Sequence, residues 1–161
     1  MNLIILDIDG VLATEETSKL PAHELYAYPF DKACVKIFNE ILEETKAEII
    51  LSSDWRLMYN NDLDTLDEVF KHNGVIKSPI DITRNLGDRG KDILDYIEKN
   101  IYRIKQFVIL DDLDLKVYPD NFVRCNINQG KNISIFKMDS WLSWCYSNNY
   151  WRYISFYSLS Y

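Results

Sequence analysis

Two pairs of aspartates stand directly after short apolar runs of the chain. Asp7 and Asp9 follow the run at residues 3–6, and Asp111 and Asp112 follow a similar run further along. Four like charges close together repel one another and raise each other's pKa values unless a cation neutralises them. Mg²⁺ prefers carboxylate oxygens and shares its coordination shell with substrate phosphate. These residues therefore point to a metal-assisted site for a phosphorylated substrate.

The spacing of the first pair also matters. If the chain stays extended, the side chains of Asp7 and Asp9 point the same way, so both carboxylates can reach one ligand. Gly10 suits a sharp exit of the chain close to that ligand.

Further polar groups follow a third apolar run at residues 48–51. Ser52 offers a hydroxyl, Ser53 is a second candidate for substrate binding, and backbone N–H groups beyond a strand end are natural phosphate donors. Trp55 could line a substrate entrance, and Arg56 could bind a phosphate or carboxylate through two parallel hydrogen bonds. The alternative stays open that Trp55 packs in the core and that Arg56 is solvated or pairs with a local acid.

The elements that must position these groups follow from the apolar pattern. Strands are expected at residues 3–6, 48–51, 107–110 and 122–123, and helices after Asp31, around 63–70, after Asp88 and over 138–146. Asp31 and Asp88 can cap the helices that follow them. Strands that alternate with amphipathic helices predict one α/β domain, residues 1–161, with a mainly parallel sheet flanked by helices. Ligands of such sheets bind at the carboxyl ends of the strands, where the three polar clusters would converge.

The order and spacing of these clusters resemble the motifs of the haloacid dehalogenase (HAD) superfamily. The residues that carry the resemblance are Asp7-Ile8-Asp9-Gly10-Val11, Ser52 after its apolar run, a basic residue at a helix start, and Leu110-Asp111-Asp112. More narrowly, Leu51-Ser52-Ser53-Asp54-Trp55-Arg56 and Arg89-Gly90 are similar to segments of small HAD domains, including those found in RNA-repair proteins. The resemblance implies a Rossmann-like HAD fold with a minimal cap or none.

The resemblance also implies a role for each matching residue. Asp7 matches the nucleophile that forms an aspartyl-phosphate, and Asp9 matches the general acid that protonates the leaving oxygen and then activates water. Asp9 favours a phosphatase, because dehalogenases and transport ATPases of the superfamily lack an acid there. Asp7, the backbone carbonyl of Asp9 and one of Asp111 and Asp112 match the Mg²⁺ ligands. Asp112 is the preferred ligand of that pair, with Asp111 orienting, and Ser52 matches the phosphate donor.

A cation that stabilises the nucleophile and the phosphoryl oxygens completes the pattern. Arg89, which precedes Gly90 at an expected helix start, fits best; Lys91 is its rival and Arg84 a weaker candidate.

Residues 13–30 stand where other HAD proteins insert a cap, and we expect only a short flap there. The expected activity is Mg²⁺-dependent hydrolysis of a phosphomonoester, with a nucleotide or other small phosphate ester as substrate. Because capless HAD phosphatases tend to act on macromolecules, a 3′- or 5′-phosphorylated polynucleotide end is an alternative. A catalytically quiet HAD domain used for binding or regulation is another.

Composition bounds the remaining possibilities. The net charge of −7 speaks against an extended nucleic-acid groove. Asp7 and Asp9 interrupt the apolar start too early for a secretory signal, and no run is long enough to span a membrane, so we expect a cytoplasmic protein without a membrane partner. Aromatic residues, 14% of the chain, crowd its end, and the arm at 147–161 is expected either to pack on the domain or to mediate self-association.

Overall fold

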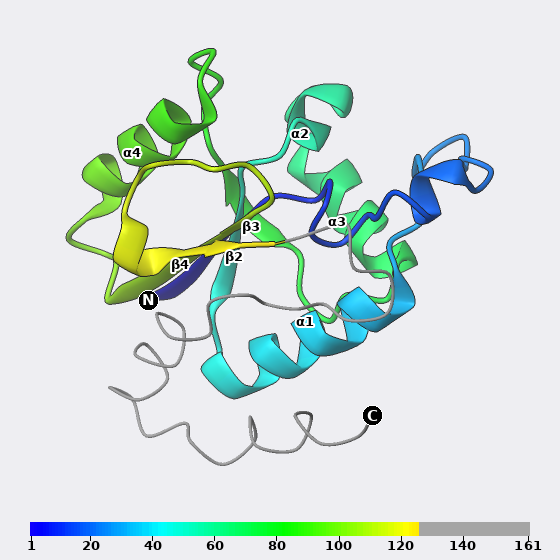
Figure 1. Cartoon of the computed structure of the whole chain (residues 1–161), viewed down its shortest axis with the longest axis horizontal. Helices are drawn as coiled ribbons and strands as arrows, with labels where there is room; N and C mark the ends of the chain where they lie inside the picture. The colour runs from blue at the N-terminus through cyan, green and yellow to red at the C-terminus, as the bar shows by residue number, and fades with distance from the viewer. Residues whose placement is uncertain (126–161) are drawn as a thin grey trace.

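The computed structural model describes residues 1–125, and its strands form one parallel sheet (Figure 1). In the order β3-β2-β1-β4-β5, its members are β3 (Pro79–Ile82), β2 (Glu48–Leu51), β1 (Asn2–Leu6), β4 (Gln106–Asp111) and β5 (Phe122–Arg124). Every neighbouring pair is parallel. The predicted α/β fold with a parallel sheet is confirmed.

Four α-helices connect the strands within residues 1–125. They are α1 (Lys32–Thr45), α2 (Trp55–Met58), α3 (Leu63–His72) and α4 (Arg89–Asn100). The Asp31 carboxylate accepts from the first backbone N–H groups of α1, and Asp88 accepts from the N–H of Lys91 in α4 at 2.8 Å. Each cap satisfies N–H groups that have no partner within the helix, so both predicted helix starts are confirmed.

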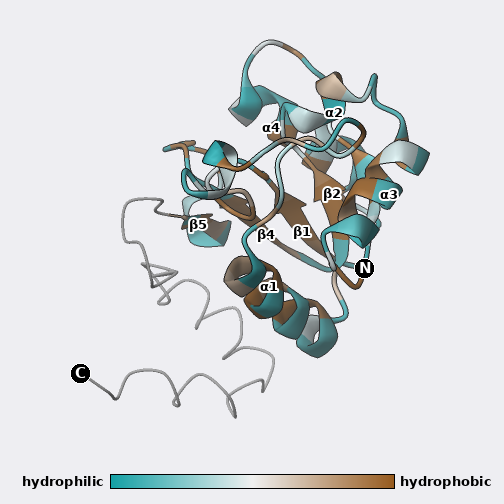
Figure 2. Cartoon of the chain, turned by 90° about the vertical axis from the view of Figure 1, so that its right-hand side faces the viewer, coloured by the Kyte–Doolittle hydropathy of each residue, from teal (hydrophilic) through white to brown (hydrophobic). Residues whose placement is uncertain are grey.

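Helices cover both faces of the sheet (Figure 2). On one face, the apolar sides of α1 and α3 pack against Ile4 and Leu6 of β1. On the other face, Ile93 and Ile97 of α4 pack against Leu3 and Ile5. Because successive side chains of β1 enter opposite layers and both layers are covered, the strand is apolar from Leu3 to Leu6.

The strand order places the ends of β1 and β4 at the centre of the domain. From β1 the chain adds β2 and then β3 on one side, whereas β4 and β5 lie on the other side, so the order reverses between β1 and β4. Backbone hydrogen bonds bring the strand ends level: Asp7 N–H donates to Leu110 O at 2.9 Å, and Ser52 N–H donates to Leu6 O at 2.8 Å. The three polar clusters therefore meet at one edge, as expected.

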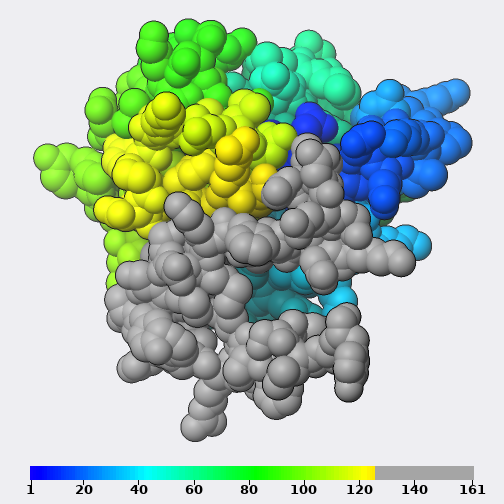
Figure 3. Space-filling view, viewed as in Figure 1, coloured from blue at the N-terminus to red at the C-terminus, as the bar shows by residue number. Residues whose placement is uncertain are grey.

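Residues 13–30 lead from β1 to α1 and hold the short 3₁₀ turn η1 (Thr17–Lys19). Figure 3 shows part of this segment in blue at the right-hand edge of the molecule. Tyr26 stacks on His72 of α3 with ring centroids 4.3 Å apart, and Phe30 N–H donates to the Asn73 side chain at 2.8 Å. Both contacts attach the segment to the end of α3.

Among the strands and α-helices of residues 1–125, β3 and α2 were not predicted. Pro79 and Asp81 interrupt the apolar pattern of β3, which an edge strand tolerates, and α2 is a single turn. The helix predicted over 138–146 and the aromatic arm at 147–161 lie outside the described residues. Among residues 1–125, no helix is long and apolar enough to cross a membrane.

Candidate active site

Asp7 lies buried at the end of β1, with both carboxylate oxygens engaged. Its Oδ1 accepts from the N–H of Ile8 at 2.8 Å, and its Oδ2 lies 2.6 Å from Nη1 of Arg89. The nearby Ser53 side chain also favours the charged form of Asp7 and lowers its pKa. The predicted nucleophile is therefore held in one orientation by neighbours from three segments.

Arg89, the first residue of α4, reaches into this edge of the sheet. Its Nη1 lies 3.2 Å from Asp111 Oδ2 as well as against Asp7, and its Nη2 lies 3.6 Å from Asp54. Its rival Lys91 is exposed and forms no ion pair with any residue in the described part. Arg84 pairs with Asp95 instead, at 2.7 Å. The geometry favours Arg89 as the cation of the site.

Three aspartates form a group that could hold a metal ion. Asp7, Asp111 and Asp112 each offer a carboxylate oxygen, and these oxygens lie within 4.8 Å of one another. An all-oxygen donor set with several negative charges fits Mg²⁺, which also keeps water ligands. Asp111 already accepts from the N–H of Leu113 at 2.9 Å and contacts Arg89. That Asp111 orients while Asp112 binds the ion directly stays a prediction.

The surroundings of these three aspartates favour their neutral, protonated forms. Burial, reinforced by the charge of Asp111, raises the pKa of Asp7 to about 7, although Arg89 opposes the shift. Burial also raises the pKa values of Asp111 and Asp112, and the nearby charge of Asp9 adds to the shift of Asp112. Burial alone would lower the pKa of Arg89, but Asp7 and Asp111 outweigh it and raise that pKa. A bound cation would relieve this repulsion.

Gly10 allows the first motif to approach the acid pair. Its φ of +73° lies in the left-handed region, and a Cβ built there would lie 2.7 Å from side-chain atoms of Asp112. The sharp exit predicted for Gly10 is confirmed, and its reason is the proximity of Asp112.

Asp9 has a partner that the sequence did not reveal. Its carboxylate is exposed, and the indole Nε1 of Trp55 donates to both of its oxygens at 3.1 Å. The two residues are 46 positions apart. Trp55 is buried, which favours the packing alternative over a place at a substrate entrance. Its indole instead contacts Asp9, the predicted general acid.

Ser52, Ser53 and Arg56, which were all predicted to lie at the site, have different neighbours. The buried Ser52 hydroxyl accepts from Thr83 at 3.1 Å, whereas Ser53 is the serine that contacts Asp7. Arg56 is 1% exposed, pairs with Asp92 at 2.7 Å and donates to the carbonyl oxygen of Ser53. This geometry favours the pairing alternative over substrate binding by Arg56.

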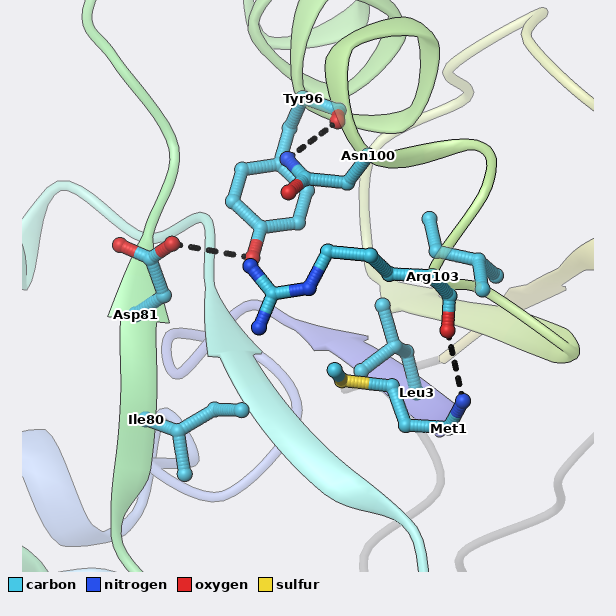
Figure 4. Close-up of a pocket in the computed structure, with 8 residues that line it drawn as sticks. Met1, Leu3, Ile80, Asp81, Tyr96, Asn100 and Arg103 are labelled. Carbon is cyan, nitrogen blue, oxygen red and sulfur yellow. Dashed lines mark hydrogen bonds between the residues drawn. The ribbon is translucent and has the colours of Figure 1, made fainter.

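A separate pocket lies at the opposite edge of the sheet, near the start of β1 (Figure 4). Its lining includes Arg103 and Asp81, and the Tyr96 hydroxyl donates to Asp81 at 3.0 Å. None of the clustered acids lines it.

The fold and the acids around its central strand are those of the HAD class, as the sequence motifs predicted. The chain belongs to the family described as HAD domains in Swiss Army Knife RNA repair proteins, whose family model matches residues 3–131. The matched range includes every candidate site residue. Neither a search of curated proteins nor a search of solved structures finds a match.

Proposed function

We propose that this HAD domain is a Mg²⁺-dependent phosphomonoesterase in which Asp7 is the nucleophile. The observation that carries the proposal is the setting of Asp7 at the strand-order reversal. Arg89 lies 2.6 Å from it, and the carboxylates of Asp111 and Asp112 lie close enough to share a cation. Membership of the HAD class supports a hydrolase in general.

In the first step, a carboxylate oxygen of Asp7 attacks the phosphorus atom. The bond from phosphorus to the leaving oxygen breaks, and Asp9 supplies the proton that this oxygen takes up. Arg89 stabilises the negative charge of the phosphoryl oxygens. Mg²⁺ would be held by Asp7 and Asp112, with Asp111 orienting, and would supply further positive charge to the phosphoryl group.

In the second step, Asp9, now a carboxylate, takes a proton from a water molecule. The water oxygen forms a bond to phosphorus, the bond to Asp7 breaks, and inorganic phosphate is released with Asp7 restored. The same carboxyl group thus acts as acid and then as base, as covalent catalysis in two steps requires.

The test is hydrolysis of p-nitrophenyl phosphate with and without Mg²⁺. We expect Mg²⁺-dependent release of nitrophenol that Asp7→Asn lowers by at least about a thousandfold, because an amide is a poor nucleophile. Asp64→Asn, the same change at an exposed acid of α3, should leave the rate unchanged. Activity that survives Asp7→Asn would refute the proposed nucleophile, and a wild type without activity on any phosphomonoester would favour the quiet alternative.

A phosphorylated RNA end is a second candidate substrate, supported by the RNA repair proteins named in the family description. The connection from β1 to α1 is only residues 7–31, and Asp9 and Asp54 at the site are exposed, which supports access by a large substrate. A panel of 3′- and 5′-phosphorylated oligonucleotides and nucleoside monophosphates separates the candidates by kcat/KM. The cytoplasmic location and self-association through residues 147–161 stay predictions.

A further inference from the structure

A buried aromatic side chain holds the exposed carboxylate of Asp9. The indole Nε1 of Trp55 lies 3.1 Å from each of the two carboxylate oxygens. Trp55 is 2% exposed and begins α2, directly after the polar turn that follows β2. The contact therefore joins the first motif to the second across the edge where substrate would bind.

Trp55 is itself fixed by packing. The Phe30 ring meets it edge-on, with centroids 5.5 Å apart, and Phe30 in turn packs edge-on against Phe70 at 5.6 Å. The ring of Tyr59 also lies near Trp55, with centroids 6.3 Å apart. A donor held this firmly can orient the flexible group that it contacts.

The chemistry of indole determines which group is the donor in this contact. Its N–H donates and cannot accept, so a proton on Asp9 can never be passed to Trp55. When Asp9 is protonated, the indole pairs with the oxygen that lacks the proton, and the O–H group is left to point elsewhere.

We propose that Trp55 is a positioning residue that aims the acid proton of Asp9 at the leaving oxygen of the substrate. The inference rests on the proposed function. In the step concerned, the O–H bond of Asp9 breaks and the proton joins the leaving oxygen as its bond to phosphorus breaks. Asp9 becomes a carboxylate whose two oxygens share the indole N–H, which is the arrangement described above.

The experiment compares kcat/KM for two substrates whose leaving groups differ in their need for a proton. Nitrophenolate is a weak base and leaves without one, whereas the alkoxide of glycerol 2-phosphate must be protonated. Because general acid catalysis contributes about 10²–10⁴-fold, we expect Trp55→Phe to lower kcat/KM for the alkyl ester by ~10–100-fold. The same variant should change kcat/KM for p-nitrophenyl phosphate by less than about threefold, because that step needs no acid.

Two controls separate positioning from packing. Phe30→Leu loosens the contact with Trp55 but keeps the indole N–H, and Tyr59→Phe removes a buried hydroxyl that has no partner among the described residues. Tyr59→Phe should not change the ratio between the substrates, whereas Phe30→Leu, which weakens the packing that fixes Trp55, should change it less than Trp55→Phe does. In an Asp9→Asn background, Trp55→Phe should have no further effect on the alkyl ester, because no acid remains to be aimed.

Equal losses on both substrates, or a further loss in the Asp9→Asn background, would overturn the positioning role. If thermal denaturation shows that Trp55→Phe does not fold, Trp55→Met provides a second side chain without an N–H that adapts to irregular space. Failure of the proposed function looks different, because Asp7→Asn would then keep its activity on both substrates.

Discussion

At position 10 the site leaves no room for a side chain. Gly10→Ala would place a methyl group against Asp112 and force a non-glycine residue to a φ of +73°. We expect the backbone conformation to cost about 1–2 kcal/mol of the free energy of unfolding, with Mg²⁺ affinity and kcat falling in addition as Asp112 moves. Urea denaturation and Mg²⁺ titration measure the two effects.

Gly87→Ala is the matched control for that substitution. Gly87 has a φ of +82°, but a Cβ there meets nothing within 4 Å. It should show the cost in stability without the loss of Mg²⁺ affinity. Equal losses of affinity in both variants would contradict the role given to the contact between Gly10 and Asp112.

At the residue scale, the sequence predicted the acidic residues that can be recognised from local spacing. Asp7, Asp9 and the pair Asp111 and Asp112 are recognisable because each stands at the end of an apolar strand. The partner of Asp9 was not predictable, because Trp55 is equally well explained as a core residue and no local pattern joins positions 46 apart.

At the scale of elements, a buried ion pair ties the turn after β2 to α4. Arg56 Nη2 lies 2.7 Å from Asp92, its Nη1 donates to Ser53 O at 2.7 Å, and Asp92 also accepts from the N–H of Leu86. Asp92 lies one helical turn beyond Arg89. The pair therefore links the serine that contacts Asp7 with the helix that supplies its cation.

Removing one partner of this pair should be more damaging than removing both. We expect Asp92→Leu or Arg56→Met alone to cost about 3–5 kcal/mol, because each leaves a buried charge without its partner. The double variant should recover much of that loss. Urea denaturation of the four proteins gives the coupling free energy, and strictly additive losses would show that the pair does not act as a unit.

Elements were predictable where apolar periodicity and caps agree. Asp31 and Asp88 marked the starts of α1 and α4 correctly. The strand β3 was missed because Pro79 and Asp81 break its pattern, although both suit an edge strand, which β3 is in the sheet of residues 1–125. The pairing of Arg56 with Asp92 depends on how α2 and α4 pack, which propensity does not encode.

For the whole molecule, the buried acids make stability depend on pH and on Mg²⁺. Asp7 has a pKa of about 7 in the folded chain against an ordinary value of 3.8, so the folded state holds this proton more tightly than the unfolded state. Its contribution to stability is therefore present at low pH and is lost as pH rises from about 4 to about 7. Metal binding needs the deprotonated form and counteracts the loss.

We therefore expect Mg²⁺ to raise the Tm more at about pH 8 than at about pH 5. Thermal denaturation with Mg²⁺ or with EDTA at both pH values measures the difference. In Asp7→Asn the part of the pH dependence due to Asp7 should vanish. A shift of Tm by Mg²⁺ that is equal at both pH values would contradict a site built on Asp7.

Part of the net charge of −7 is concentrated at the candidate site. Four of the 25 acidic residues, Asp7, Asp9, Asp111 and Asp112, gather at one edge of the sheet, where the proposed substrate is also an anion. Arg89 is the cation that faces them from α4. Substrate binding should accordingly depend on Mg²⁺ and Arg89 rather than on a basic surface.

The most direct test of the central claim is to find the phosphoryl group on Asp7. Asp9→Asn should slow the second step, so this variant, mixed with p-nitrophenyl phosphate and Mg²⁺ and quenched with acid, should accumulate the covalent form. We predict that peptide mass spectrometry locates one phosphoryl group on Asp7, and that it is absent from the Asp7→Asn, Asp9→Asn double variant. Turnover by the wild type without such an adduct in Asp9→Asn, or an adduct on Ser52 or Ser53 instead, would contradict the account.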